Sequence, residues 1–351
     1  SGFLMHDTPE RYDLAQQWAR VLASFTQRKG IKRVTLQERT IPTTIRAARE
    51  HFDTVTRRRS LDVSAASENY KNVMDASERY AVAHRNYLTF TLDLVALGSQ
   101  LRSLGGGKEA ITSLARIEAA NLADALQAAR VKVRRWLNPR EVAALSRIAV
   151  DPESAANVQN RPTEQAGVDP AAIGPMYLEE PRNRNGIVYS DSGVHTTMWI
   201  HEWPRSDTAV GFVAPIVFAR QPHSGEAVTH ILSLVLTPVP VSKALKRIRD
   251  EKKVWRGNER LRAKRGADGS AADAADWDAL EEQEEEIVAG HGEFRYGAYL
   301  TVSARDEEHL DQAIAGMRNA LARAGMEAQI LYCQQAEALM VNALPVGLGM
   351  K

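Results

Sequence analysis

The residues with the most evident chemical potential are four histidines, His195, His201, His223 and His230. If "HTTMWIH" is a regular strand, His195 and His201 share one face but lie about 20 Å apart along it. A metal site needs three or four converging ligands. We therefore expect satisfied or surface histidines and no metal site. A small-molecule or metal-dependent enzyme using the His195–His230 region stays open as an alternative.

Phosphate chemistry has one weak candidate, "LGGGKEA" at Leu104–Ala110. Glu109 stands where Ser or Thr would hold magnesium, and no glycine lies five residues before Gly107. The strand-to-helix junction Ser303–Asp306 contains no glycine either. We expect no phosphate loop, no cofactor, and neither tight binding nor hydrolysis of ATP.

Nucleophilic chemistry also lacks a pattern. Ser190-Asp191-Ser192-Gly193 favours a turn, and no G-x-S-x-G elbow is present. Cys333, the single cysteine, falls in a predicted buried strand, where a small hydrophobic role is the default. No residue is therefore assigned as catalytic, and the chain is expected not to be an enzyme.

Composition limits the class of protein. The 351 residues suffice for two domains, and the hydrophobic fraction of 44% permits sizeable cores. A net charge of +1 argues against direct nucleic-acid binding. No apolar run reaches the roughly 20 residues of a membrane helix. The chain starts without Met and close to a helix, which suggests an excised fragment.

Hydrophobic periodicity predicts an α+β fold with repeated halves. Helices are expected at 8–28, 109–130 and 306–323, and strands at "KRVTLQERT", "YAVAHRNYLTFTLDLVAL", "VKVRRW", "AVTHILSLVLTPVP" and "YGAYLTVSA". Residues 1–150 form a first α/β half, 151–186 a proline-rich linker and 187–351 a second half. We expect two ferredoxin-like βαββαβ halves in pseudo-repeat, each with a helical hairpin insertion, and with the first strand truncated.

The hairpin insertion of the second half, residues 242–289, has a sharp charge pattern. Lys243–Arg265 holds eleven basic and three acidic residues, and 267–288 holds nine acidic residues and no Lys or Arg. "RGADGS" between them predicts a turn. Two antiparallel helices with facing opposite charges follow, either as a self-satisfied solvated hairpin or as a docking arm. The candidate partner-docking residues are Lys246, Arg249, Lys253, Arg256, Glu281 and Glu285.

Several short motifs are shared with a known family. Leu300-Thr301-Val302, Asp306–Leu310 and Leu344-Pro345-Val346-Gly347 resemble the strand, helix start and "LP-G" ending of the amino-terminal, non-motor domain of type IV secretion (conjugation) ATPases. Ser192–Arg205, and Glu38-Arg39-Thr40 with Pro42, are similar to segments of non-ATPase relatives in actinobacterial conjugative elements. These motifs are structural and include no catalytic residue.

The resemblance implies an assembly component of a conjugative secretion system at the cytoplasmic side of the inner membrane. Its partners would be other secretion-system subunits, with self-association open, and any membrane contact would use a segment absent from this chain. The alternative is the excised amino-terminal domain of a secretion ATPase whose motor follows Lys351. A Walker A sequence beyond that point in the parent gene would favour the ATPase.

Overall fold

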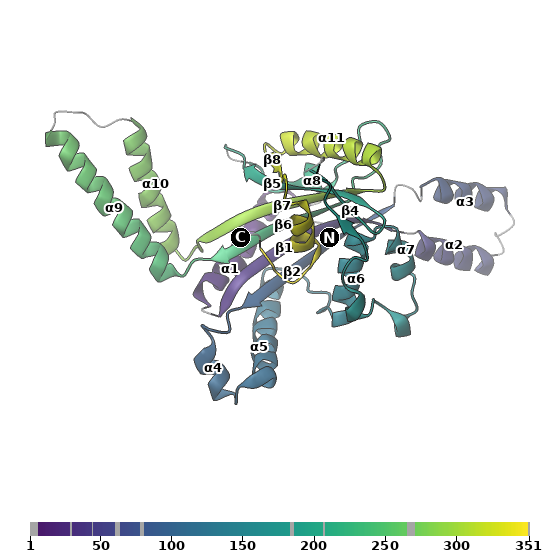
Figure 1. Cartoon of the computed structure of the whole chain (residues 1–351), viewed down its shortest axis with the longest axis horizontal. Helices are drawn as coiled ribbons and strands as arrows, with labels where there is room; N and C mark the ends of the chain where they lie inside the picture. The colour runs from purple at the N-terminus through teal and green to yellow at the C-terminus, as the bar shows by residue number, and fades with distance from the viewer. Residues whose placement is uncertain are drawn as a thin grey trace. The chain divides into compact units, whose positions relative to one another are not determined.

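The computed structural model describes residues 6–28, 30–43, 45–59, 64–77, 81–182, 186–205, 208–264 and 271–349. The chain is α+β, about half helix and a fifth strand, with an antiparallel sheet. The strand order is β2-β1-β6-β7-β5-β4-β3, and β8 pairs with β5 (Figure 1). The strands are β1 Ile31–Pro42, β2 Val82–Leu92, β3 Leu178–Glu179, β4 Val188–Ser190, β5 Val194–Glu202, β6 His230–Pro238, β7 Phe294–Ala304 and β8 Glu327–Ile330.

Several helices begin at residues whose side chains cap them. Asp7 accepts a hydrogen bond from Glu10 N, Asn138 and Glu141 form a capping box, and Asp306 accepts from His309 N. The helices are α1 Thr8–Gln27, α2 Arg46–Arg58, α3 Ala65–Ser77, α4 Gly98–Ser103, α5 Gly107–Ala128, α6 Pro139–Val150, α7 Ser154–Gln159, α8 Ala214–Val217, α9 Val241–Lys264, α10 Ala271–Val288, α11 Glu307–Arg323 and α12 Gln335–Ala343.

The chain divides into two compact units, each built from several segments. Unit 1 comprises 1–34, 90–135 and 236–296, and unit 2 comprises 35–89, 136–235 and 297–351. The division cuts four strands, β1, β2, β6 and β7.

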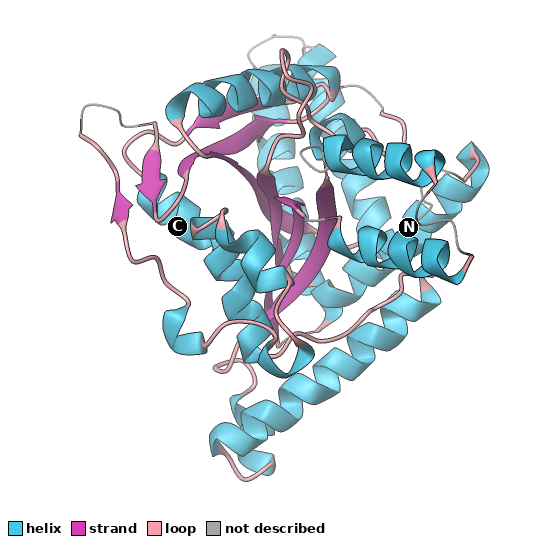
Figure 2. Ribbon diagram, turned by 90° about the vertical axis from the view of Figure 1, so that its right-hand side faces the viewer, coloured by secondary structure: helices cyan, strands magenta, loops and turns pink. Residues whose placement is uncertain are grey.

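Unit 2 contains a large apolar core under α11. Met198 and Ile200 of β5 and Leu300 and Val302 of β7 alternate onto one face, as the twofold period of a strand dictates. Met317 of α11 packs against them with other small and apolar residues of the same helix. Helices lie on both sides of the strands (Figure 2). The apolar side holds the α11 helix in place.

The opposite face of the same strands is polar and buried. Thr197 of β5 bonds Thr301 of β7 through their hydroxyls at 2.9 Å. Gln335 of α12 accepts from Thr197 N at 2.6 Å, and Asn342 of α12 donates to Thr301 Oγ1 at 2.9 Å. Buried polar groups are stable when they are hydrogen-bonded. This face therefore fixes α12 by directional bonds, together with the apolar contacts of Leu339.

Unit 1 has thinner cores. Helices α1 and α5 contact each other, and Arg28 makes an ion pair with Glu118 at 2.9 Å. Gly292 needs its lack of a side chain, because a Cβ there would lie 2.9 Å from Ala23 Cα. The α9–α10 pair belongs to this unit and is treated below.

Two sequence predictions about elements are wrong. The segment "VKVRRW" at 131–136 is not a strand but an extended, largely exposed connection between α5 and α6. Cys333 is exposed and has φ +60°, beyond the end of β8, so it is not a buried strand residue. An alternating apolar pattern predicted both strands, but 131–136 is not assigned to the sheet, and the ladder that β8 forms with β5 ends at Ile330, before Cys333. Propensity for strands depends on such pairing.

The proline-rich segment 151–186 carries some structure of its own. It contains α7, β3 and two short 3₁₀ turns. Ala155, Val158 and Val168 pack against Ala143 and Ile148 of α6 in a small buried cluster. Within the described residues, no helix is long and apolar enough to cross a lipid bilayer.

Candidate functional site

The predicted helical hairpin is present as α9 and α10, which lie side by side in antiparallel directions (Figure 1). We call residues 241–288 the arm. Its buried stripe is narrow: among the described side chains of the arm, those of Ala244, Ile248 and Ile287 are buried. Further along the arm, the rings of Trp255 and Trp277 contact each other across the two helices, with their centroids 4.7 Å apart. The predicted "RGADGS" turn at 265–270 lies outside the described residues.

Among the described residues of the arm, opposite charges meet across the two helices at Lys252 and Glu284. Lys252 Nζ donates to Glu284 Oε2 at 2.6 Å. Arg247 Nη2 donates to Gln283 Oε1 at 3.1 Å and to Glu293 Oε2 at 3.0 Å. Arg247 makes hydrogen bonds to Glu293 and also to Glu251, and these raise the pKa of Arg247 above its ordinary value. The facing of opposite charges predicted from the sequence is thus confirmed for Lys252 and Glu284.

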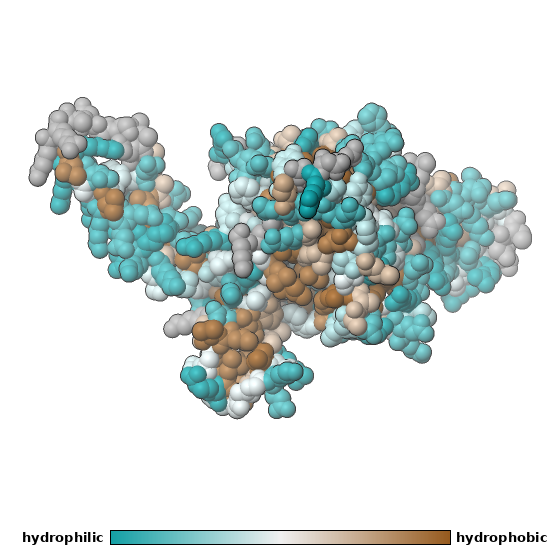
Figure 3. Space-filling model, viewed as in Figure 1, coloured by the Kyte–Doolittle hydropathy of each residue, from teal (hydrophilic) through white to brown (hydrophobic). Residues whose placement is uncertain are grey.

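The six predicted docking residues are all exposed on the arm and make no ion pair between the limbs within the described residues. Arg249 donates to Leu245 O on its own helix, and Lys253 lies 3.4 Å from Asp250. Arg256 sits over the Trp277 ring, 5.2 Å from its centroid. Lys246, Glu281 and Glu285 have no side-chain partner among the described residues. The visible face of the arm is mostly hydrophilic, with scattered apolar atoms (Figure 3).

Helical spacing gathers five of these charges on one broad face of the arm. The contact of Arg256 with Trp277 places both on the same face. Arg249 lies seven residues before Arg256, and Glu281 and Glu285 follow Trp277 at intervals of four, so each set forms a stripe. Arg247, which contacts Gln283, marks the opposite face. We call the face with Arg249, Lys253, Arg256, Glu281 and Glu285 the striped face.

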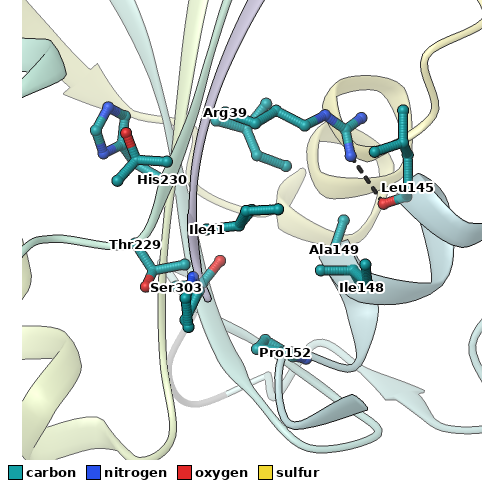
Figure 4. Close-up of a pocket in the computed structure, with 12 residues that line it drawn as sticks. Arg39, Ile41, Leu145, Ile148, Ala149, Pro152, Thr229, His230 and Ser303 are labelled. Atoms are coloured by element: carbon teal, nitrogen blue, oxygen red, sulfur yellow. Dashed lines mark hydrogen bonds between the residues drawn. The ribbon is translucent and has the colours of Figure 1, made fainter. Parts of the chain in front are cut away.

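A second group of candidates is buried in unit 2 around Arg39 of β1. The guanidinium, 1% exposed, donates to Gln37 Oε1 at 2.6 Å and to two backbone carbonyls, of Leu145 at 2.8 Å and Ala343 at 2.5 Å. Figure 4 shows the bond to Leu145 at the end of the extended side chain. Burial lowers the pKa of Arg39 to about 10. The Arg39 guanidinium is bound by carbonyl groups of α6 and α12. It therefore connects β1 with these two helices and does not face a substrate.

The neighbouring Glu38 points to the other face of β1 and lies between two histidines. Its Oε1 is 3.2 Å from His84 Nδ1, and its Oε2 is 3.2 Å from His230 Nε2. The second contact is close enough for an ion pair, but its angles do not make a hydrogen bond. His230 is fully buried, and its Nδ1 bonds Val228 O at 2.7 Å.

His195, the first of the histidines singled out in the sequence, is satisfied in the interior. Its Nε2 bonds Ser190 Oγ at 2.6 Å and its Nδ1 bonds Ser303 Oγ at 2.7 Å. Burial lowers the pKa of His195 to about 4, so the ring is neutral at pH 7. Gly193 permits this packing, because a Cβ there would lie 2.9 Å from His195 Nε2. Residues 191–193 form the predicted turn, between β4 and β5.

The remaining histidines do not converge with His195. His201 is exposed and its ring lies 5.8 Å from that of Trp199. Within the described residues, no three His, Cys, Asp or Glu side chains form a group that could hold a metal ion. The cavity lined by Arg39, His230 and Ser303 among others holds about 20 Å³ (Figure 4). That volume is close to the space of one water molecule.

The glycine triplet lies in a different context from a phosphate loop. Gly105, Gly106 and Gly107 all have positive φ and join helix α4 to helix α5. A phosphate loop joins a strand to a helix and points backbone N–H groups at the ligand. The triplet therefore serves the reversal between two helices.

A scan against protein-family models finds no matching family, and a search of curated proteins finds no match to this chain.

Sequence reasoning missed the buried polar centre around Glu38 and Arg39. The available signal is the run "QERT" inside a strand that otherwise alternates. Charged residues are seldom buried unless they are paired. Their position in mid-strand therefore signalled either an exposed strand or a buried network, and the pattern alone does not separate these.

Proposed function

We propose that this chain is a structural, non-enzymatic assembly component of a conjugative type IV secretion system. The observation that carries the proposal is the arm, whose striped face presents charges of both signs that make no ion pair between the two limbs within the described part of the chain. An exposed pair in water contributes only about 0–1 kcal/mol to folding, so these charges stabilise the chain little. Their arrangement is better suited to recognising a partner, because complementary charge favours association and orientation. The resemblance described above supplies the secretion context and the cytoplasmic face of the inner membrane.

We also propose the finer fold that goes with this function. In the second half, residues 187–351, the order β8-β5-β7-β6 supports a ferredoxin-like unit with the arm inserted between β6 and β7. The first half, 1–150, has β1, β2 and the α2–α3 pair as its counterpart, and 151–186 as the connection. Support for the pseudo-repeat is weaker there because 131–136 is not a strand.

The decisive experiment removes the arm. Replacing Lys246–Glu284 by a short glycine linker leaves β6 and β7 outside the deletion, and the Val239 N–Glu293 O bond at 2.9 Å can still form between the strand ends. We expect the variant to fold, by circular dichroism and a cooperative melt, while conjugative transfer is lost. Arg116→Glu, an exposed change on α5, is the matched control and should transfer normally. A folded deletion variant with full transfer would refute the docking role.

Two measurements separate the alternatives. Calorimetry with ATP and magnesium should show no saturable binding, since no phosphate loop is recognisable in the sequence. Metal analysis of purified protein tests the enzyme that would use the His195–His230 region. Micromolar ATP affinity, or stoichiometric metal that His195→Gln and His230→Gln remove, would contradict the assembly proposal.

A further inference from the structure

We propose that the striped face of the arm binds the striped face of a second copy of this chain. The inference rests on the proposed function and names one partner of the arm. Its basis is that the face is self-complementary: a basic stripe on α9 lies beside an acidic stripe on α10. A twofold axis along the arm places α9 of one copy against α10 of the other, twice, which is the isologous arrangement of a closed dimer.

The levels of the charges along the arm agree with this arrangement. Lys252 pairs with Glu284, and Ile248 packs in one cluster with Ile287. A residue of α9 and a residue of α10 whose numbers add up to about 535 therefore lie at the same height along the arm. By this register Arg249 is level with Glu285, and Lys253 with Glu281. A twofold axis parallel to the arm preserves these heights. Arg249 and Lys253 therefore each meet an acidic residue of the second copy.

The charge distribution also discriminates against other pairings. A shift of one helical turn moves each side chain by about 5.4 Å and misaligns the stripes. Parallel contact of α9 with α9 would oppose Arg249, Lys253 and Arg256 to one another, and like charges repel. A partner with one uniform charge could satisfy only one of the two stripes. The alternation of sign within a single face thus favours a second copy.

The test uses two complementary variants of the full chain. Variant A carries Arg249→Glu and Lys253→Glu, so that two of the three basic residues of the α9 stripe become acidic. Variant B carries Glu281→Lys and Glu285→Lys, so that both stripes are basic. The Lys252–Glu284 pair and Arg256 over Trp277 are left intact. The control, Lys243→Glu with Glu286→Lys, reverses two exposed charges elsewhere on the same helices.

Sedimentation equilibrium at low and high salt gives the readout. We expect the native chain and the control to dimerise, with an affinity that falls as salt screens the charges. Variants A and B should each lose at least tenfold in self-association, and an equimolar mixture should form the mixed dimer. Circular dichroism checks that each variant is folded.

The outcomes are separable from those of the functional test. A native chain that stays monomeric, or variants A and B that do not associate when mixed, overturns the self-pairing. If the arm deletion still abolishes transfer in that case, the docking role stands and the partner is a different subunit. If the deletion transfers normally, the proposed function fails whatever the oligomeric state.

Discussion

At the scale of single residues, the interior of unit 2 depends on polar side chains of types that are usually found at a protein surface. His195 and Arg39 are both almost completely buried, and both make hydrogen bonds to other buried groups. Buried polar groups are costly when unpaired, so these bonds specify one arrangement of the strands and helices.

His195 leads to a prediction about pH. Its pKa is about 4 in the folded chain and about 6.5 when unfolded, so the unfolded state takes up the proton first as pH falls. The contribution to stability is complete above pH 6.5 and is lost between pH 6.5 and 4. At pH 5 the loss is about 2 kcal/mol. Urea unfolding at pH 7.5 and pH 5 measures it.

The control for this prediction is a pair of substitutions. His195→Gln removes the titrating ring, so the stability difference between the two pH values should shrink by about 2 kcal/mol even though the variant is less stable at both. His201→Gln, at an exposed position of the same strand, should leave the difference unchanged. An unaltered difference in His195→Gln would mean that other groups carry the acid sensitivity.

At the scale of elements, the positions of helices follow from local signals, whereas strands depend on their partners. Asp7, Asn138 and Asp306 cap the starts of helices, and capping is a contact between neighbours in sequence. The strand predicted at 131–136 fails because no local signal encodes a ladder partner. The docking residues could be placed on the arm from charge alone. The face of the arm on which each docking residue lies could be assigned only with the contact of Arg256 with Trp277.

In helix α11, helix propensity alone would predict the wrong sign for the effect of one substitution on stability. Gly316 lies in its interior, where Ala is intrinsically better by about 1 kcal/mol. A Cβ there would lie 2.4 Å from Arg220 O, so the backbone near α8 must move away from the helix. We expect Gly316→Ala to destabilise the chain by about 2 kcal/mol, the range of overpacking in a core. Thermal unfolding measures the change.

The arm supplies the matched control for α11. Gly257 is also in a helix interior, but a Cβ there meets nothing within 4 Å. Gly257→Ala should therefore show only the propensity gain and raise stability of the arm by up to about 1 kcal/mol. The opposite signs of the two substitutions separate close packing from helix propensity. Destabilisation by both would show that the arm is packed more tightly than its exposed residues indicate.

At the scale of the whole molecule, stability is distributed unevenly between the two compact units. Unit 2 holds the core around Leu300 and Met317, both fully buried, and the polar network on the other face of the same strands. In unit 1, the arm's apolar cluster has three buried side chains among its described residues, Ala244, Ile248 and Ile287. Local opening is easiest where few apolar contacts must be broken.

This distribution predicts the order of amide hydrogen exchange. Amides of 250–262 in α9 should exchange well before those of 298–303 in β7, because opening the arm breaks few apolar contacts beyond Trp255 with Trp277. Exchange followed by mass spectrometry on the full chain measures both segments together. The same experiment at rising protein concentration tests the dimer independently, since pairing through the striped face should slow exchange in α9 and α10 while leaving β7 unchanged. Equal protection of α9 and β7 in dilute solution would mean that the arm opens only with the rest of the chain, and its narrow buried stripe would then not determine its stability.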